Sequence, residues 1–177
     1  MTDLLHQLED QHEDLRLALR LLVTLADRAA AGATLPNSDC AVVLTFLRDF
    51  AFGVHMPLEQ KTVLASLAAH GTEEDVHCVG QILRTQDEAQ GLLHCLRVLW
   101  EPTGALTASE CEGLSATARA LDRMLTRCMR LEEDRLFRAA KRAPGDDQVD
   151  WHKDAEDCHG ATAHWRKALQ DVARRWT

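Results

Sequence analysis

Six side chains of metal-binding or metal-supporting type occupy corresponding positions in the two halves of the chain: His12, His55, Glu59, Gln86, Cys128 and Glu132. The pair His55 and Glu59 is spaced four residues apart, and so is the pair Cys128 and Glu132, so each pair would share one face of a helix. Imidazole, thiolate and carboxylate groups bind transition metals well, whereas a neutral amide oxygen binds them weakly. The residue types and spacing therefore predict a metal site that helices must assemble.

The spacing of these residues repeats along the chain. His55 follows His12 by 43 residues, and Cys128 follows Gln86 by 42. The segments HMPLEQKTVL and CMRLEEDRLF, which contain the two pairs, align without a gap. We interpret the chain as two helical hairpins of one pattern. Packed together, they would bring the six side chains to the middle of a bundle, where two carboxylates could bridge two metal ions.

Helices are the elements expected to position these residues. Proline and glycine mark breaks in GATLPNSD, AAHGTEED, WEPTGALT and RAPGDDQVD, and the stretches between them are rich in Leu, Ala, Arg and Glu. The sequence predicts helices over 3–31, 38–69, 73–100, 107–142 and 150–175, with start signals near Asn37, Thr72 and Thr107. The predicted fold is all-α. An up-down-up-down four-helix bundle would cover residues 1–143, and a helical extension over 144–177 would pack on it.

Each of the first four predicted helices carries a polar group on its apolar stripe. In the first helix, His12 takes one place in the series that contains Leu8, Leu15 and Leu19. Burying such a group without a partner costs roughly 2–7 kcal/mol. These groups therefore need partners inside the fold.

Pro57 lies between His55 and Glu59 and interrupts the regular hydrogen bonding of the second helix. It has no N–H to donate to the carbonyl of Gly53. We expect a bend or a π-bulge at this point, which would re-aim His55.

Four motifs, in order, resemble those of the hemerythrin-like (HHE cation-binding) domain over about residues 4–140: DQHEDL, HMPLEQKTVLASL, TQDEAQGLL and CMRLEEDRLF. The family carries a helix-one EH, a helix-two H-x-x-x-E, an EHDEGR-like segment and HIxxEDxxLF. The resemblance implies the metal ligands His12, His55, Glu59, Gln86, Cys128 and Glu132. It also implies non-haem iron, as one ion or a di-iron centre, and a small diatomic ligand. The implied role is sensing, storage or handling of iron, oxygen or nitric oxide, rather than oxygen transport.

Gln86 and Cys128 stand where the family has histidines. Gln86 could donate to a bound water or to a carboxylate instead of binding metal. A Cys128 thiolate would favour zinc or a thiolate-iron centre, whereas a thiol would be a small core side chain. Zinc and the absence of metal therefore stay open. The alternative function is a metal-free or redox-responsive interaction protein that uses its fifth helix for partners.

Two other groups of residues have types and spacing that occur in metal sites. Ferritin-like di-iron sites use the motif E-x-x-H. It occurs here as EDVH, with Glu74 and His77, and as EDCH, with Glu156 and His159. Both copies lie near the starts of predicted helices and outside the central stripes. The fifth predicted helix forms either a second metal or haem-type site or an amphipathic cap, and it carries His152, Glu156, Cys158 and His159. No motif for nucleophilic catalysis is present, so we predict no catalytic residue.

Composition restricts the partners. The formal net charge of −8 gives no electrostatic footprint for nucleic acid or an anionic membrane. The first residues lack the charge and apolar pattern of a signal peptide, and no uninterrupted apolar stretch approaches the ~20 residues that span a bilayer. The six cysteines form no CxxC pair. We expect them to be free thiols in a cytoplasmic protein.

Overall fold

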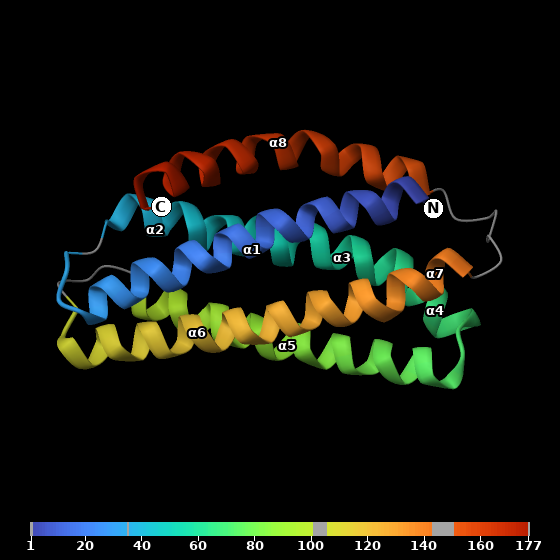
Figure 1. The fold of residues 1–177 in the computed structure, drawn as a ribbon, viewed down its shortest axis with the longest axis horizontal. Helices are drawn as coiled ribbons and strands as arrows, with labels where there is room; N and C mark the ends of the chain where they lie inside the picture. Colours follow the sequence, from blue (N-terminus) through green and yellow to red (C-terminus); the bar gives the residue numbers. More distant parts are fainter. Residues whose placement is uncertain (1, 35, 101–105, 143–150, 177) are drawn as a thin grey trace.

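The computed structural model describes the backbone of residues 2–34, 36–100, 106–142 and 151–176, and their side chains except at 2, 3 and 151–162. All regular structure within these ranges is helical, so the all-α prediction is confirmed there. Figure 1 shows the helices as long rods that lie lengthwise beside one another.

The described residues form five rods. The first is α1 (Thr2–Ala30), and the third is α5 (Glu73–Trp100). The second runs without a break through α2 (Asn37–Phe46), η1 (Leu47–His55), α3 (Met56–Glu59), η2 (Gln60–Leu64) and α4 (Ala65–His70). The fourth joins α6 (Ala108–Leu131), η3 (Glu132–Leu136) and α7 (Phe137–Arg142), and the fifth is α8 (Trp151–Trp176). Every predicted helix boundary lies within one residue of an observed one.

The rods end where local chemistry requires it. Gly32 follows α1 with a positive φ of 85°, and the N–H of Ala33 donates to the carbonyl of Arg28. Gly71 follows the last residue of the second rod. This position favours glycine, because a Cβ there would collide with the carbonyl oxygen of Leu67. Thr107 caps α6 in a capping box with Glu110, as the start signal predicted.

Three stretches of the rods, η1, η2 and η3, are π-helical. The expected irregularity at Pro57 is therefore present, with π-helical turns on both sides of it. A π-helical turn holds more residues than an α-helical one, so it rotates the side chains that follow. His55 ends η1, Glu59 immediately precedes η2, and Glu132 opens η3. The irregular backbone thus lies beside candidate ligands.

The core consists of two separate apolar clusters along the rods. Leu15, Ala51, Ala89 and Leu125 belong to one cluster. The other cluster contains residues nearer the opposite ends of the same rods: Leu8, Val63, Ile82 and Leu136. On each of the first four rods, the candidate ligands fall between these two sets. A polar layer therefore divides the apolar core.

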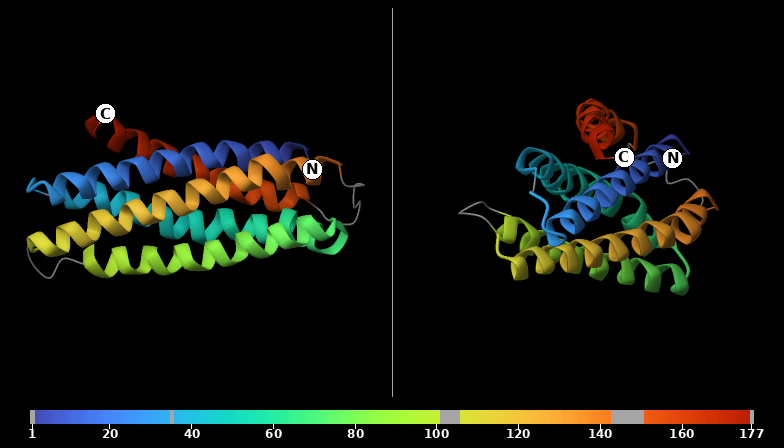
Figure 2. Two further views of the ribbon diagram at one scale, coloured as in Figure 1. Left: turned by 60° about the horizontal axis from the view of Figure 1, so that its bottom comes forward. Right: turned by 60° about the vertical axis from the view of Figure 1, so that its left-hand side comes forward.

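The α8 rod packs against α1 and α2 on the outside of the other rods (Figure 2). Arg166 of α8 donates to the carboxylate of Asp14, and Arg175 and the indole N–H of Trp176 donate to Asp39. The Trp165 ring meets Phe46 edge to face. The division into a bundle over 1–143 and an extension over 144–177 stays a prediction.

One described helix, the rod from Asn37 to His70, is long and apolar enough to cross a membrane by length and composition alone. Half of its most apolar window is buried within the structure. The core helix of a soluble protein passes the same test, so the feature is weak support for a membrane span.

Candidate metal centre

The structure buries all six predicted ligands in the polar layer. Their exposed fractions are small: His12 0%, His55 2%, Glu59 0%, Gln86 3%, Cys128 4% and Glu132 2%. All of them except His12 line one cavity of about 10 Å³, which has room for one water-sized particle. His12 adjoins the same group, because its Nε2 lies 3.4 Å from Glu132 Oε2.

Side-chain oxygens of Gln11 and Glu133 orient the two imidazoles of the layer. His55 Nδ1 lies 2.8 Å from Gln11 Oε1, and His12 Nδ1 lies 2.7 Å from Glu133 Oε1. Because these oxygens are acceptors, each Nδ1 carries the proton that it donates. In the neutral rings the lone pair is then on Nε2. A histidine that binds metal through Nε2 is commonly held in this way.

Gln11 and Glu133 were not predicted as part of the site. Gln11 lies next to His12 and is 1% exposed. Glu133 also accepts hydrogen bonds from Arg16, which anchors the outer carboxylate. The signals available in the sequence were a polar residue next to His12 and a second glutamate after Glu132 in LEED, and neither signal is specific.

Each of the two buried carboxylates, Glu59 and Glu132, accepts a hydrogen bond from a neutral side chain through one of its oxygens. Gln86 Nε2 donates to Glu59 Oε2 at 2.9 Å, and Gln60 Nε2 in turn donates to Gln86 Oε1 at 2.7 Å. The Cys128 thiol donates to Glu132 Oε1 at 3.1 Å. Gln86 therefore takes the supporting role that its weak affinity for metals suggested.

Burial dominates the protonation of the carboxylate and thiol in this layer. It raises the pKa of Glu59 well above its ordinary value, and the charge of Glu132 raises it further, while the Gln86 amide opposes the shift. Burial also raises the pKa of Cys128, and the charge of Glu132 raises it further. Without a cation, Cys128 is thus a neutral thiol.

The two histidines are shifted in opposite directions. Burial lowers the pKa of His55 well below its ordinary value, and the charge of His12 acts in the same sense. For His12, burial opposes protonation, but Glu132 and Glu133 outweigh it and raise its pKa. His55 is therefore neutral and suited to binding through nitrogen, whereas a metal at His12 would displace a proton.

Three buried polar atoms of the described side chains have no hydrogen-bond partner: Gln11 Nε2, His12 Nε2 and Glu59 Oε1. The last two belong to predicted ligands. An unpaired buried acceptor destabilises a fold by about 1–3 kcal/mol. A cation in the layer would give the Glu59 oxygen a partner and, after displacing a proton, would bind the lone pair of His12 Nε2, so these residues fit a bound metal ion.

As the side chains stand, no three His, Cys, Asp or Glu residues within the described ranges are arranged to hold a metal ion. In this arrangement Gln86 donates to one oxygen of Glu59, and Cys128 donates to one oxygen of Glu132. Comparison of the chain with known protein families, curated proteins and solved structures gave no match.

The EDVH motif does not lie in the core. Glu74 and His77 of EDVH are exposed, and Glu74 pairs with Arg135 at the surface. The side chains of His152, Glu156, Cys158 and His159 lie outside the described residues. Five cysteines fall within the description, and all five are free thiols: Cys40, Cys78, Cys95, Cys111 and Cys128.

Proposed function

We propose that the chain is a hemerythrin-like metal-binding protein that holds non-haem iron in the polar layer. In this proposal the first four rods form an up-down-up-down bundle, and the protein is cytoplasmic. The observation that carries the proposal is the pair of imidazoles whose Nδ1–H groups are held by Gln11 and Glu133, beside two buried carboxylates. Histidine with carboxylate is a donor set typical of non-haem iron(II).

The strong donors in the layer suffice for one ion. His12 and His55 would supply nitrogen, and Glu59 and Glu132 would supply oxygen, once the carboxylates turn from their present partners. A second ion would need Cys128 as a thiolate, which must give up the proton that it donates to Glu132, or Gln86 as an amide, which binds metals weakly. A mononuclear site is therefore favoured over a di-iron one. Bound iron with an open position would supply binding of a small diatomic molecule, which suits sensing or handling of oxygen or nitric oxide.

Metal analysis of protein purified anaerobically from iron-supplied cells tests the proposal. We expect close to one iron per chain, with little zinc, and loss of the iron in His55→Ala and in Glu59→Ala. Exposed His94→Ala and Glu112→Ala serve as matched controls that keep the iron. A chain that purifies free of metal, with the same stability as the two site variants, would overturn the proposal.

A metal-free bundle is the second candidate, and one observation favours it. The pairs Gln86 with Glu59 and Cys128 with Glu132 partly satisfy the layer without any metal. Redox regulation through Cys128 gains no support, because this thiol is 4% exposed and its pKa is raised. The same metal analysis separates the two candidates.

A further inference from the structure

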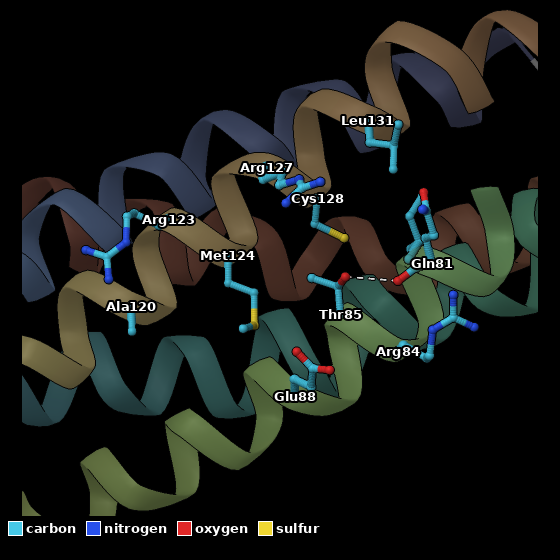
Figure 3. Close-up of a pocket in the computed structure, with 11 residues that line it drawn as sticks. Gln81, Arg84, Thr85, Glu88, Ala120, Arg123, Met124, Arg127, Cys128 and Leu131 are labelled. Carbon is cyan, nitrogen blue, oxygen red and sulfur yellow. Dashed lines mark hydrogen bonds between the residues drawn. The ribbon is translucent and has the colours of Figure 1, made fainter. Parts of the chain in front are cut away.

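A second cavity lies outside the polar layer, as a groove of about 560 Å³ between α5 and α6. Its volume is within the range of small-molecule sites, which is about 300–1,000 Å³. Figure 3 shows Gln81 and Thr85 on the side of α5 that faces Cys128 and Leu131 of α6, with Arg84 and Arg123 toward opposite ends of the groove. The groove therefore has the size and mixed lining of a ligand site.

The charge of the groove is opposite to that of the chain. Three arginines line it, Arg84, Arg123 and Arg127, with Glu88 as the single carboxylate, whereas the formal net charge of the chain is −8. None of these three arginines forms an ion pair with another described residue, although Arg16, Arg166 and many other arginines do. Unpaired guanidinium groups spread along one concave surface attract an anion.

The floor of the groove is apolar and adjoins the buried layer. Ile82 and Cys128 are 1% and 4% exposed, and Met124 lies beside them in the lining. Cys128 also lines the inner cavity next to Glu59 and Glu132, so one side chain separates the two spaces. An occupant of the groove would thus rest an apolar body on the floor directly outside the candidate metal centre.

We propose that this groove binds a small organic anion, with an oxyanion group held by Arg123 and Arg127 and an apolar body on Met124 and Leu131. Arg123 and Arg127 are four residues apart on α6, so they project from one helical face. Planar guanidinium groups bind phosphate or carboxylate oxygens in pairs. The site does not depend on iron in the layer.

Calorimetric titration of the full chain with phenyl phosphate tests the proposal. We expect saturable binding that is tighter than that of inorganic phosphate, which lacks the apolar body, and no binding of benzyl alcohol, which lacks the charge. The Arg123→Gln/Arg127→Gln variant should weaken binding by about tenfold or more, because hydrogen bonds to charged groups are lost. Glu88→Gln should tighten it, since the variant removes the one repelling charge.

The matched control is Arg20→Gln/Arg130→Gln, which changes the net charge equally at exposed positions outside the groove. It should keep the affinity of the parent chain, and circular dichroism should show that all variants are folded. Equal weakening in the control and groove variants would show general charge attraction and would overturn the site. So would the absence of saturable phenyl phosphate binding up to about 10 mM, or a weaker affinity in Glu88→Gln. Because metal-free protein is used throughout, these results do not bear on the iron proposal.

Discussion

Glu59 is the candidate ligand whose burial a bound cation would offset most directly. It is fully buried, one of its carboxylate oxygens has no partner, and Glu132 raises its pKa. In metal-free protein, Glu59→Gln should raise the free energy of unfolding by about 1–3 kcal/mol near pH 8, because the neutral amide removes a buried charge. Denaturant unfolding of both chains measures the difference.

The pH dependence of that difference has a definite sign. The folded-state pKa of Glu59 lies above its ordinary value of 4.5, so the folded chain holds this proton more tightly than the unfolded chain does. Stability contributed by the protonated carboxyl is present at low pH and is lost as pH rises from 4.5 through the raised pKa. The advantage of Glu59→Gln should therefore grow over this window, while exposed Glu112→Gln shows no such trend. A variant less stable than the parent at every pH would contradict the assignment.

Cys128 gives a prediction about reactivity. Its pKa is raised and it is 4% exposed, whereas Cys95 is exposed. Only a thiolate reacts with alkylating agents. In native metal-free protein, iodoacetamide should label Cys95 at least about tenfold faster than Cys128, and the two should react alike after unfolding. Peptide mapping by mass spectrometry measures both rates, and equal native rates would show that the layer is open.

At the residue scale, the sequence predicted which polar side chains are buried in one layer better than it predicted their hydrogen-bond partners. The six candidates are periodic, because helix geometry repeats each inward position. The groups that orient the imidazoles have no such signal. Gln11 and Glu133 reach His55 and His12 from rods distant in sequence, and only the packed fold brings them together.

Among the elements, the rods themselves were predictable and their irregular turns only in part. Proline and glycine end each rod for local reasons, so the boundaries could be read from the sequence. The π-helical stretches beside Pro57 have a local cause in its missing N–H. No proline lies in η3, and its wide turn at Glu132 depends on packing that a single segment does not reveal.

The attachment of α8 depends on Asp39 of α2. This carboxylate accepts hydrogen bonds from Arg175 and from the indole of Trp176, and Arg175 lowers its pKa. We expect Asp39→Asn to lower the free energy of unfolding by about 1–3 kcal/mol at neutral pH. Chemical denaturation measures this loss.

The change in unfolding free energy caused by Asp39→Asn should depend on pH, and the contribution of Asp39 should be lost toward low pH, whereas that of Glu59 is lost toward high pH. The folded-state pKa of Asp39 lies below 3.8, so its contribution is present above that value and is lost as pH falls through the lowered pKa. Asp171→Asn is the matched control, because it breaks an exposed pair with Arg174 within α8 and should cost less than about 0.5 kcal/mol. Equal losses in the two variants would mean that Asp39 does not anchor the helix.

For the whole molecule, the polar layer interrupts a core that would otherwise be continuous. The apolar clusters on either side supply the hydrophobic stabilisation, and the layer between them holds ionisable side chains from three rods together with Gln86 of α5. Such a layer contributes little stability when it is metal-free, since its charges are buried and incompletely paired. A metal held by His12, His55, Glu59 and Glu132 would link the first, second and fourth rods, so its effect should appear in global unfolding.

Iron(II) added under anaerobic conditions should therefore raise the melting temperature of the whole chain. At a free concentration of about 100 times Kd, binding stabilises the folded state by about 2.7 kcal/mol, which corresponds to roughly 5–10 °C for a chain of this size. Scanning calorimetry should show one transition that moves as a unit, because the proposed ligands come from three separate rods of the fold. In Glu59→Gln and His55→Ala the shift should shrink to below about 2 °C, while in Glu112→Gln it should be complete. A similar shift in all these chains would place the iron elsewhere on the molecule.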